Sequence, residues 1–391
     1  MKIQKLGKLT STFTFTFIAA LLFVACTAKT PDETGSETNI KIGVITYEKE
    51  GNIERVSTLN SATLAAEKFN GVESLEIGGV RKQVTLIVKG IKGHAPESSV
   101  KAVRELVNQD NVVAILGPQS SIDAIPAGEV AEQSRIPLIA PISTNPKTTA
   151  GRDYVFRMGF LDDFQGHVAA YFSREELGAE SAAVVYNVAN PYSRLIAEEF
   201  RKHFKEDGGR VEAFESYTTD EDDFSRQLEM VRSRDPDVLF LPNYSTETEL
   251  IVHQARKMGI GSVFMGGDSW DRHEFAKNLE FDGSYMTAHY SADIRTSENE
   301  SFVKEYLDRY GLLPGDTAAL TYDAFNMIFN AIKHQGNADP ESIRDGLYSM
   351  GPFEGVGGGI DFTDTGDPEK GAVILKFTEG KVRFIGIVNP N

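Results

Sequence analysis

The sequence has a single cysteine, Cys26, among its 391 residues. An intrachain disulfide, a zinc site built from cysteines and a Cys-x-x-Cys redox centre are therefore excluded. The seven histidines form no His-Glu-x-x-His motif. No Gly-x-Ser-x-Gly or Walker motif occurs, and the glycine run Gly355–Gly359 does not open a predicted helix. We therefore expect a protein that is not an enzyme and that carries neither a cofactor nor a metal ion.

Basic residues are few for a chain of this length. Lysine and arginine total 40, against 57 aspartate and glutamate residues, which gives a net charge of −17. A surface of this sign repels phosphate backbones, and we therefore do not expect nucleic acid as a partner. Hydrophobic residues make up 41% of the chain, which is enough for a packed core, and the length suits two or three domains.

The N-terminal segment resembles an export signal. Three lysines precede an apolar run that begins at Phe13 and is shorter than the roughly 20 apolar residues that span a membrane. Cys26 follows directly, in a context that resembles the lipobox of bacterial lipoproteins. We expect residues 1–25 to be a signal peptide, Cys26 to carry lipid, and residues 26–38 to form a lipidated, flexible tether. A plain secretory signal with a chance cysteine is the alternative.

From Asn39 onward, short apolar runs alternate with amphipathic segments. Runs such as Ile40–Ile45 and Val112–Gly117 predict buried parallel strands, and the segments between them predict helices. The pattern restarts after about residue 160 and ends in a predicted hairpin that turns at Glu379-Gly380. The sequence thus predicts an α/β fold of two doubly wound parallel-sheet lobes with a cleft between them.

The residues that follow the predicted strands are mainly hydroxyls, aromatics and one acid. In open parallel sheets, ligands bind beyond the carboxyl ends of the strands. The segments at these ends are Thr46-Tyr47, Gly117–Ser121, Ile142–Asn145, Asn187–Tyr192, Asn243–Ser245 and Gly267-Asp268. Their side chains suit a small polar ligand that carries both charges.

A series of motifs occurs in the order typical of one family: IKIGVI, GPQSS, PLIAPISTNP, YVFRMGFLDDFQG, FSRQL, FMGGD, ALTYDAFN, and FEGVGGGIDF with GDPEKG. From about Ile40 to its end, the chain resembles the type I periplasmic binding proteins. The resemblance is to their leucine/isoleucine/valine-binding branch, the substrate-binding proteins of branched-chain amino-acid ABC transporters. It implies two lobes joined by three crossovers, near Leu161, His289 and Gly366.

The resemblance also implies boundaries and partners. Lobe 1 would comprise residues 39–160 and 290–365, and lobe 2 would comprise residues 161–289 and 366–391. The expected partners are a small-molecule ligand, an amino acid by resemblance, and an ABC transporter permease. We expect a monomer in the cell envelope that contacts the membrane only through its lipid anchor and faces the periplasm or the extracellular side. A ligand-sensing or regulatory lipoprotein on the same fold is the alternative.

Matched residue by residue, the family's ligand-binding positions are Ser120, Ser121, Ile142, Ser143, Thr144, Tyr192, Tyr244 and Asp268. Ser120 and Thr144 match positions that hold the ligand carboxylate, with backbone contributions at Ile142 and Ser143. A purely structural role is the alternative for these residues. Ser120 and Ser121 suit a helix N-cap, and Thr144 suits a turn.

Asp268 matches an acid that receives the ligand ammonium. It lies in the other lobe, and we expect it to be hydrated and unpaired until the cleft closes. Its alternative is an N-cap for a helix near Asp271. Tyr192 and Tyr244 match aromatics that line the wall of lobe 2, or they are ordinary cleft residues. Arg157 is expected to be a structural ion-pair partner rather than a ligand contact.

Two features leave the ligand open. The loop Tyr47–Asn52 is crowded with charge where the family often has glycines. Its Glu48 and Lys49, or the nearby Arg55, would face either a polar ligand or water. Trp270 would either cap the pocket or pack between the lobes.

Overall fold

The computed structural model describes residues 39–71 and 75–390. The predicted signal peptide of residues 1–25, the lipidation site Cys26 and the tether of residues 26–38 lie outside the described residues, and they stay predictions. No helix of the described part is long and apolar enough to cross a lipid bilayer.

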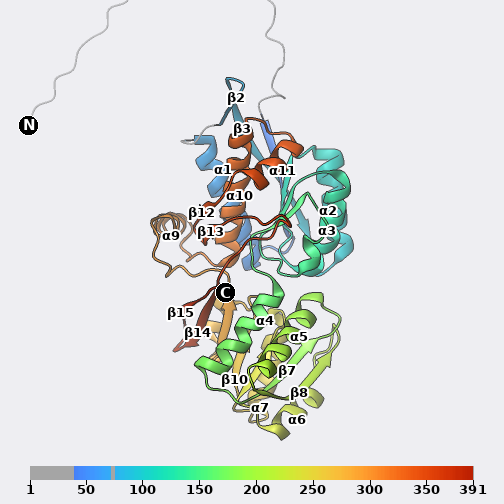
Figure 1. The fold of residues 1–391 in the computed structure, drawn as a ribbon, viewed down its shortest axis with the longest axis vertical. Helices are drawn as coiled ribbons and strands as arrows, with labels where there is room; N and C mark the ends of the chain where they lie inside the picture. Colours follow the sequence, from blue (N-terminus) through green and yellow to red (C-terminus); the bar gives the residue numbers. More distant parts are fainter. Residues whose placement is uncertain (1–38, 72–74, 391) are drawn as a thin grey trace, which may run out of the picture. The chain divides into compact units, whose positions relative to one another are not determined.

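The first of two large sheets has six strands in the order β2-β3-β1-β4-β5-β6 (Figure 1). These strands are β1 (Asn39–Tyr47), β2 (Leu75–Ile77), β3 (Val80–Ile91), β4 (Ala114–Leu116), β5 (Leu138–Ala140) and β6 (Val155–Arg157). All pairs are parallel except β2 with β3. That hairpin, which the sequence analysis missed, turns at Gly78 and Gly79, whose φ angles are 59° and 77°. Two positive φ angles are what a tight two-residue hairpin requires.

Helices cover both faces of this sheet. One face is covered by α1 (Ile53–Gly71), α9 (Ser297–Tyr310), α10 (Asp316–Gln335) and α11 (Pro340–Ser349), and the other by α2 (Pro96–Glu105) and α3 (Ser121–Ser134). Successive side chains of a strand point to opposite faces. Accordingly, Ile42 and Val44 of β1 pack with α1 and α10, whereas Ile45 packs with α2 and α3. Figure 1 shows the blue α1 beside the orange α10, although they lie far apart in the sequence.

The second sheet has seven strands in the order β15-β14-β11-β10-β9-β7-β8. They are β7 (Ser181–Asn187), β8 (Arg210–Tyr217), β9 (Val238–Leu241), β10 (Val263–Gly266), β11 (Tyr285–Ala288), β14 (Ala372–Thr378) and β15 (Lys381–Val388). One face is covered by α4 (Asp162–Tyr171) and α5 (Pro191–Glu206), and the other by α6 (Ser225–Arg234), α7 (Ser245–Lys257) and α8 (Arg272–Lys277). The predicted C-terminal hairpin is confirmed as the antiparallel pair β14 and β15.

The chain passes between the two sheets three times. The connecting segments are residues 157–162, 288–297 and 360–372, the last of which follows a small hairpin of β12 (Phe353–Gly355) and β13 (Gly358–Ile360). The predicted fold class is therefore confirmed: two doubly wound α/β lobes joined by three crossovers. We propose that the lobe boundaries lie within these segments, after residues 160, 289 and 365.

The core of lobe 1 yields a test of its packing. Phe69 of α1 and Phe329 of α10 are each 2% exposed, and their ring centroids are 3.5 Å apart. We predict that Phe329→Ala lowers the free energy of unfolding by about 3–5 kcal/mol, because lost burial and a new cavity act together. Chemical denaturation measures this change. Leu279→Ala is the control, because Leu279 is 75% exposed and should change stability by no more than about 0.5 kcal/mol. Equal effects of the two substitutions would contradict the prediction.

Candidate functional site

A cavity of about 500 Å³ lies at the carboxyl ends of strands from both sheets. In the first sheet, β3 and β4 lie on opposite sides of β1, and in the second, β8 and β9 lie on opposite sides of β7. Such a reversal of strand order leaves a crevice, in which ligands of α/β sheets bind. The cavity's volume is within the range of small-molecule sites.

All eight residues expected from the sequence line this cavity. They are Ser120, Ser121, Ile142, Ser143, Thr144, Tyr192, Tyr244 and Asp268. The first five follow strands of lobe 1 and the last three follow strands of lobe 2. The fold therefore brings them together, while their contact with a ligand stays a prediction.

The start of α3 forms one side of the cavity. The first N–H groups of a helix have no partner within it, and such a helix start attracts anions. The Ser120 hydroxyl donates a hydrogen bond to Asp123 Oδ2 at 2.6 Å, so its proton is already engaged. Ser121 Oγ accepts from Ser143 Oγ at 3.0 Å and from the Asn145 N–H at 3.3 Å. The hydroxyl proton of Ser121 and the backbone at the helix start therefore remain for an anionic group.

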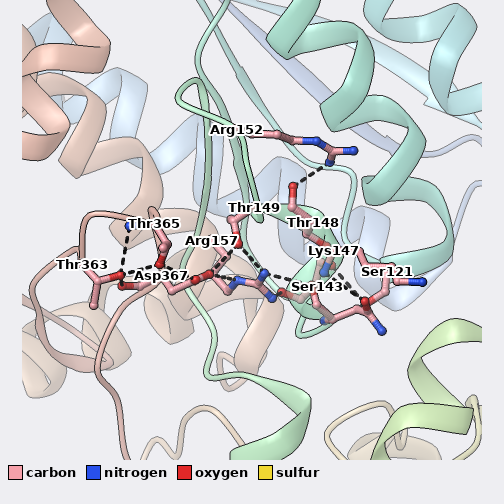
Figure 2. Close-up of polar contacts among 11 residues, drawn as sticks. Ser121, Ser143, Lys147, Thr148, Thr149, Arg152, Arg157, Thr363, Thr365 and Asp367 are labelled. Carbon is pink, nitrogen blue, oxygen red and sulfur yellow. Dashed lines mark hydrogen bonds and ion pairs between the residues drawn. The ribbon is translucent and has the colours of Figure 1, made fainter.

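Arg157 holds in place the loop after β5, which contains Ser143 and Asn145 (Figure 2). Its side chain is fully buried, and Nε lies 2.5 Å from Asp367 Oδ1. The other guanidinium nitrogens donate to the carbonyls of Ser143 and Asn145 at 3.1 and 2.9 Å, and to Thr149 Oγ1 at 2.7 Å. The expected role of Arg157 as a structural ion-pair partner is confirmed, because these contacts use its side chain inside the protein.

Asp268, the acid expected from the sequence, is one of several acids that line the cavity. Its Oδ1 accepts from Gln165 Nε2 at 2.7 Å, and its Oδ2 lies 2.9 Å from His289 Nε2. Burial lowers the pKa of His289, so this ring is neutral and donates from Nε2. Gln165 and His289 lie on α4 and directly after β11, in the same lobe as Asp268. The expectation that Asp268 is unpaired until the cleft closes is therefore wrong, because both of its partners are independent of closure.

Trp270 and Asp271, which follow Asp268 in the sequence, each have a structural role. Asp271, and not Asp268, is the N-cap of α8, where it accepts two backbone N–H groups at 2.9 and 3.1 Å. Trp270 packs against Phe275 and donates from Nε1 to the carbonyl of Leu241 at 3.0 Å. Its ring belongs to the core of lobe 2 while lining the cavity, so it neither caps the pocket nor packs between the lobes.

Three stacked rings line one wall of the cavity. The centroids of Tyr192 and Tyr244 are 5.6 Å apart, with ring planes 4° apart. Tyr244 stacks in turn on His94 of lobe 1, with centroids 4.3 Å apart. Gly267 makes room for this wall, because a Cβ there would lie 2.1 Å from the Tyr192 hydroxyl oxygen. Sequence reasoning missed His94, and the only available signal was its place shortly after a predicted strand.

Charged side chains surround the rest of the cavity. Glu48 and Lys49 of the charged loop line it and are exposed. Arg55 instead donates to a backbone carbonyl of that loop at 2.7 Å. Sequence reasoning missed Glu54 and Arg272, which also line the cavity. Burial, together with repulsion from neighbouring acids, raises the pKa of Glu54 to about 7.

Comparison with known proteins identifies relatives over most of the chain. The profile of a family described as "Periplasmic binding protein" matches residues 39–381. The Leu/Ile/Val-binding protein homolog 1 of Brucella melitensis is 27% identical over 310 residues, which cover 78% of this chain and 82% of that protein. An amino acid binding protein of Pseudomonas aeruginosa is 28% identical over 311 residues, which cover 78% and 81% of the two chains.

Solved structures agree with this relationship. A leucine binding protein of Thermotoga maritima superposes with a TM-score of 0.83 at 29% identity, covering 90% of this chain and 99% of that one. A branched-chain amino acid transporter substrate binding protein of Streptococcus pneumoniae, solved with isoleucine, gives a TM-score of 0.82 at 29% identity, covering 90% and 100%. The resemblance to the leucine/isoleucine/valine-binding branch is thereby confirmed. The chain belongs to the periplasmic binding protein family, and the relatives named above are solute-binding proteins and not enzymes.

Proposed function

We propose that this protein captures a small amino-acid-like ligand between its lobes, outside the cytoplasm, and delivers it to the permease of an ABC importer. The observation that carries the proposal is that Asp268 and the start of α3 line one cavity. An acid and a helix start suit the ammonium and the carboxylate of a zwitterion. The similarity to proteins named as binding leucine, isoleucine and valine supports an amino acid as the ligand.

The charges around Asp268 favour an ammonium partner. Gln165 and the neutral His289 both donate hydrogen bonds to the carboxylate, and neither carries a positive charge. The carboxylate is thus held in position while its negative charge remains for the ligand. Because Ser121 and Thr144 belong to lobe 1 and Asp268 belongs to lobe 2, a zwitterion bound to both sides links the lobes.

We predict that Asp268→Asn weakens binding of an amino acid by about 1.5–3 kcal/mol, or roughly 10- to 150-fold. The substitution keeps the size of the side chain and removes the charge that the ammonium needs. Isothermal titration with leucine and with its des-amino analogue measures the effect, and the analogue should be affected little. Asp163→Asn is the matched control, because Asp163 is an exposed acid of the same lobe. Equal losses for both ligands would contradict the zwitterion.

Contacts between the lobes indicate how the cleft closes. The rings of His94 and Tyr244 stack across the cavity, and Asn145 Nδ2 donates to the carbonyl of Pro191 at 3.0 Å. We predict that a bound amino acid favours this closed arrangement, through a hinge movement at the crossovers. Small-angle scattering should then show a smaller radius of gyration with the ligand than without it. An unchanged radius at saturation would argue against closure.

We further propose a lipid-anchored monomer that faces the periplasm or the extracellular side. The basis is the leader that ends at Cys26, the only cysteine of the chain. We predict that Cys26→Ala moves the protein from the membrane fraction to the soluble fraction. Mass spectrometry of the mature N-terminus is the direct measurement. A free Thr27 or an unmodified Cys26 at that position would overturn the anchor and leave the ligand site unaffected.

A further inference from the structure

A second acidic position lies inside the cavity and is not needed for the α-ammonium. Glu54 is in the first turn of α1 in lobe 1, and Asp271 is the N-cap of α8 in lobe 2. Both line the same cavity as Asp268. Asp271 is the strongest source of electrostatic repulsion for Glu54, followed by Asp123 and Asp268. The closed cleft therefore places acids of the two lobes close to one another.

The carboxyl group of Glu54 is poorly compensated by the protein. Its Oε2 is buried and, within residues 39–71 and 75–390, has no hydrogen-bond partner. The Tyr47 hydroxyl lies beside the group and lowers its pKa, but burial and repulsion from Asp271 outweigh this effect. Asp271 Oδ1 is occupied by the first N–H groups of α8, which leaves Oδ2 open to another donor. Both acids thus have room for a further donor.

The cationic groups around the cavity have other partners or face solvent, and so do not compensate Glu54 and Asp271. Arg272 forms an ion pair with Asp316 and donates to the carbonyl of Tyr290 at 3.1 Å. Lys49 and Lys92 are exposed and remain in contact with solvent. Burial lowers the pKa of His273, which favours its neutral form. His94 is exposed and engaged in the ring stack with Tyr244. The repulsion between Glu54 and Asp271 is therefore left for a ligand to relieve.

We propose that the ligand is an amino acid with a cationic side chain, whose distal charge lies between Glu54 and Asp271. This inference rests on the proposed function, which supplies the sites for the carboxylate and the α-ammonium. A neutral side chain would close the cleft over two facing acids, whereas a cation between them turns repulsion into attraction. The same pair disfavours branched-chain amino acids, because desolvated acids without partners are costly.

Lysine and norleucine provide the test, because both have a four-carbon side chain and lysine adds the terminal ammonium. In isothermal titration at pH 7, the wild-type protein should bind lysine about 10- to 150-fold more tightly than norleucine, as expected for a charge-assisted hydrogen bond. Glu54→Gln should remove most of this preference by weakening lysine and leaving norleucine unchanged or tighter. Glu50→Gln is the control, since Glu50 is an exposed acid of the neighbouring loop and the lysine preference should persist.

Other outcomes separate this inference from the proposed function. Norleucine or leucine binding as tightly as lysine, with a loss on Asp268→Asn, would overturn the cationic side chain and leave the amino-acid receptor intact. Equal losses of both ligands in Glu54→Gln, with an unchanged unfolding temperature, would also overturn it. Failure of every amino acid to bind the wild-type protein would overturn both proposals.

Discussion

One buried cation, Arg157, links a loop that lines the cavity to the third crossover of the chain. Burial lowers the pKa of its guanidinium, and Asp367 opposes this shift most, with smaller contributions from Asp162 and Asp163. The same group holds the carbonyls of Ser143 and Asn145 (Figure 2). A planar guanidinium with five donors can hold a loop and a crossover at once, which the ammonium of a lysine cannot. The cavity-lining loop and the third crossover therefore share one support.

A second buried group, Asp323, holds the chain just before this crossover. Asp323 of α10 accepts the N–H groups of Val356 and Gly357 at 2.9 and 3.0 Å. A Cβ at Gly355 would lie 2.5 Å from this carboxylate, which explains the glycine there. Burial raises the pKa of Asp323 to about 6 and lowers the pKa of Lys370 to about 8, while the two groups attract each other. The glycine run thus wraps a buried acid.

The sequence by itself determined the order of the elements and the edge at which the site lies. The apolar run Val112–Gly117, expected to be a strand, contains β4, because a fully buried parallel strand leaves a continuous apolar run. The eight candidate residues meet because each follows a parallel strand, and such strand ends share one edge of their sheet. The strands Val155–Arg157 and Tyr285–Ala288 were missed because a buried arginine in the first, and Tyr285 and Thr287 in the second, interrupt the apolar run that marks a buried strand.

Only the tertiary structure decided which charges are compensated. The sequence placed Asp268 at the ligand but gave no sign of Gln165 and His289, which come from different elements and reach it through folding. It likewise predicted no role for Glu54, whose raised pKa arises from burial and from an acid of the other lobe. Local pattern depends on neighbours along the chain and is readable in the sequence. Burial and electrostatic partners depend on neighbours in space, and here these lie in separate lobes or separate elements.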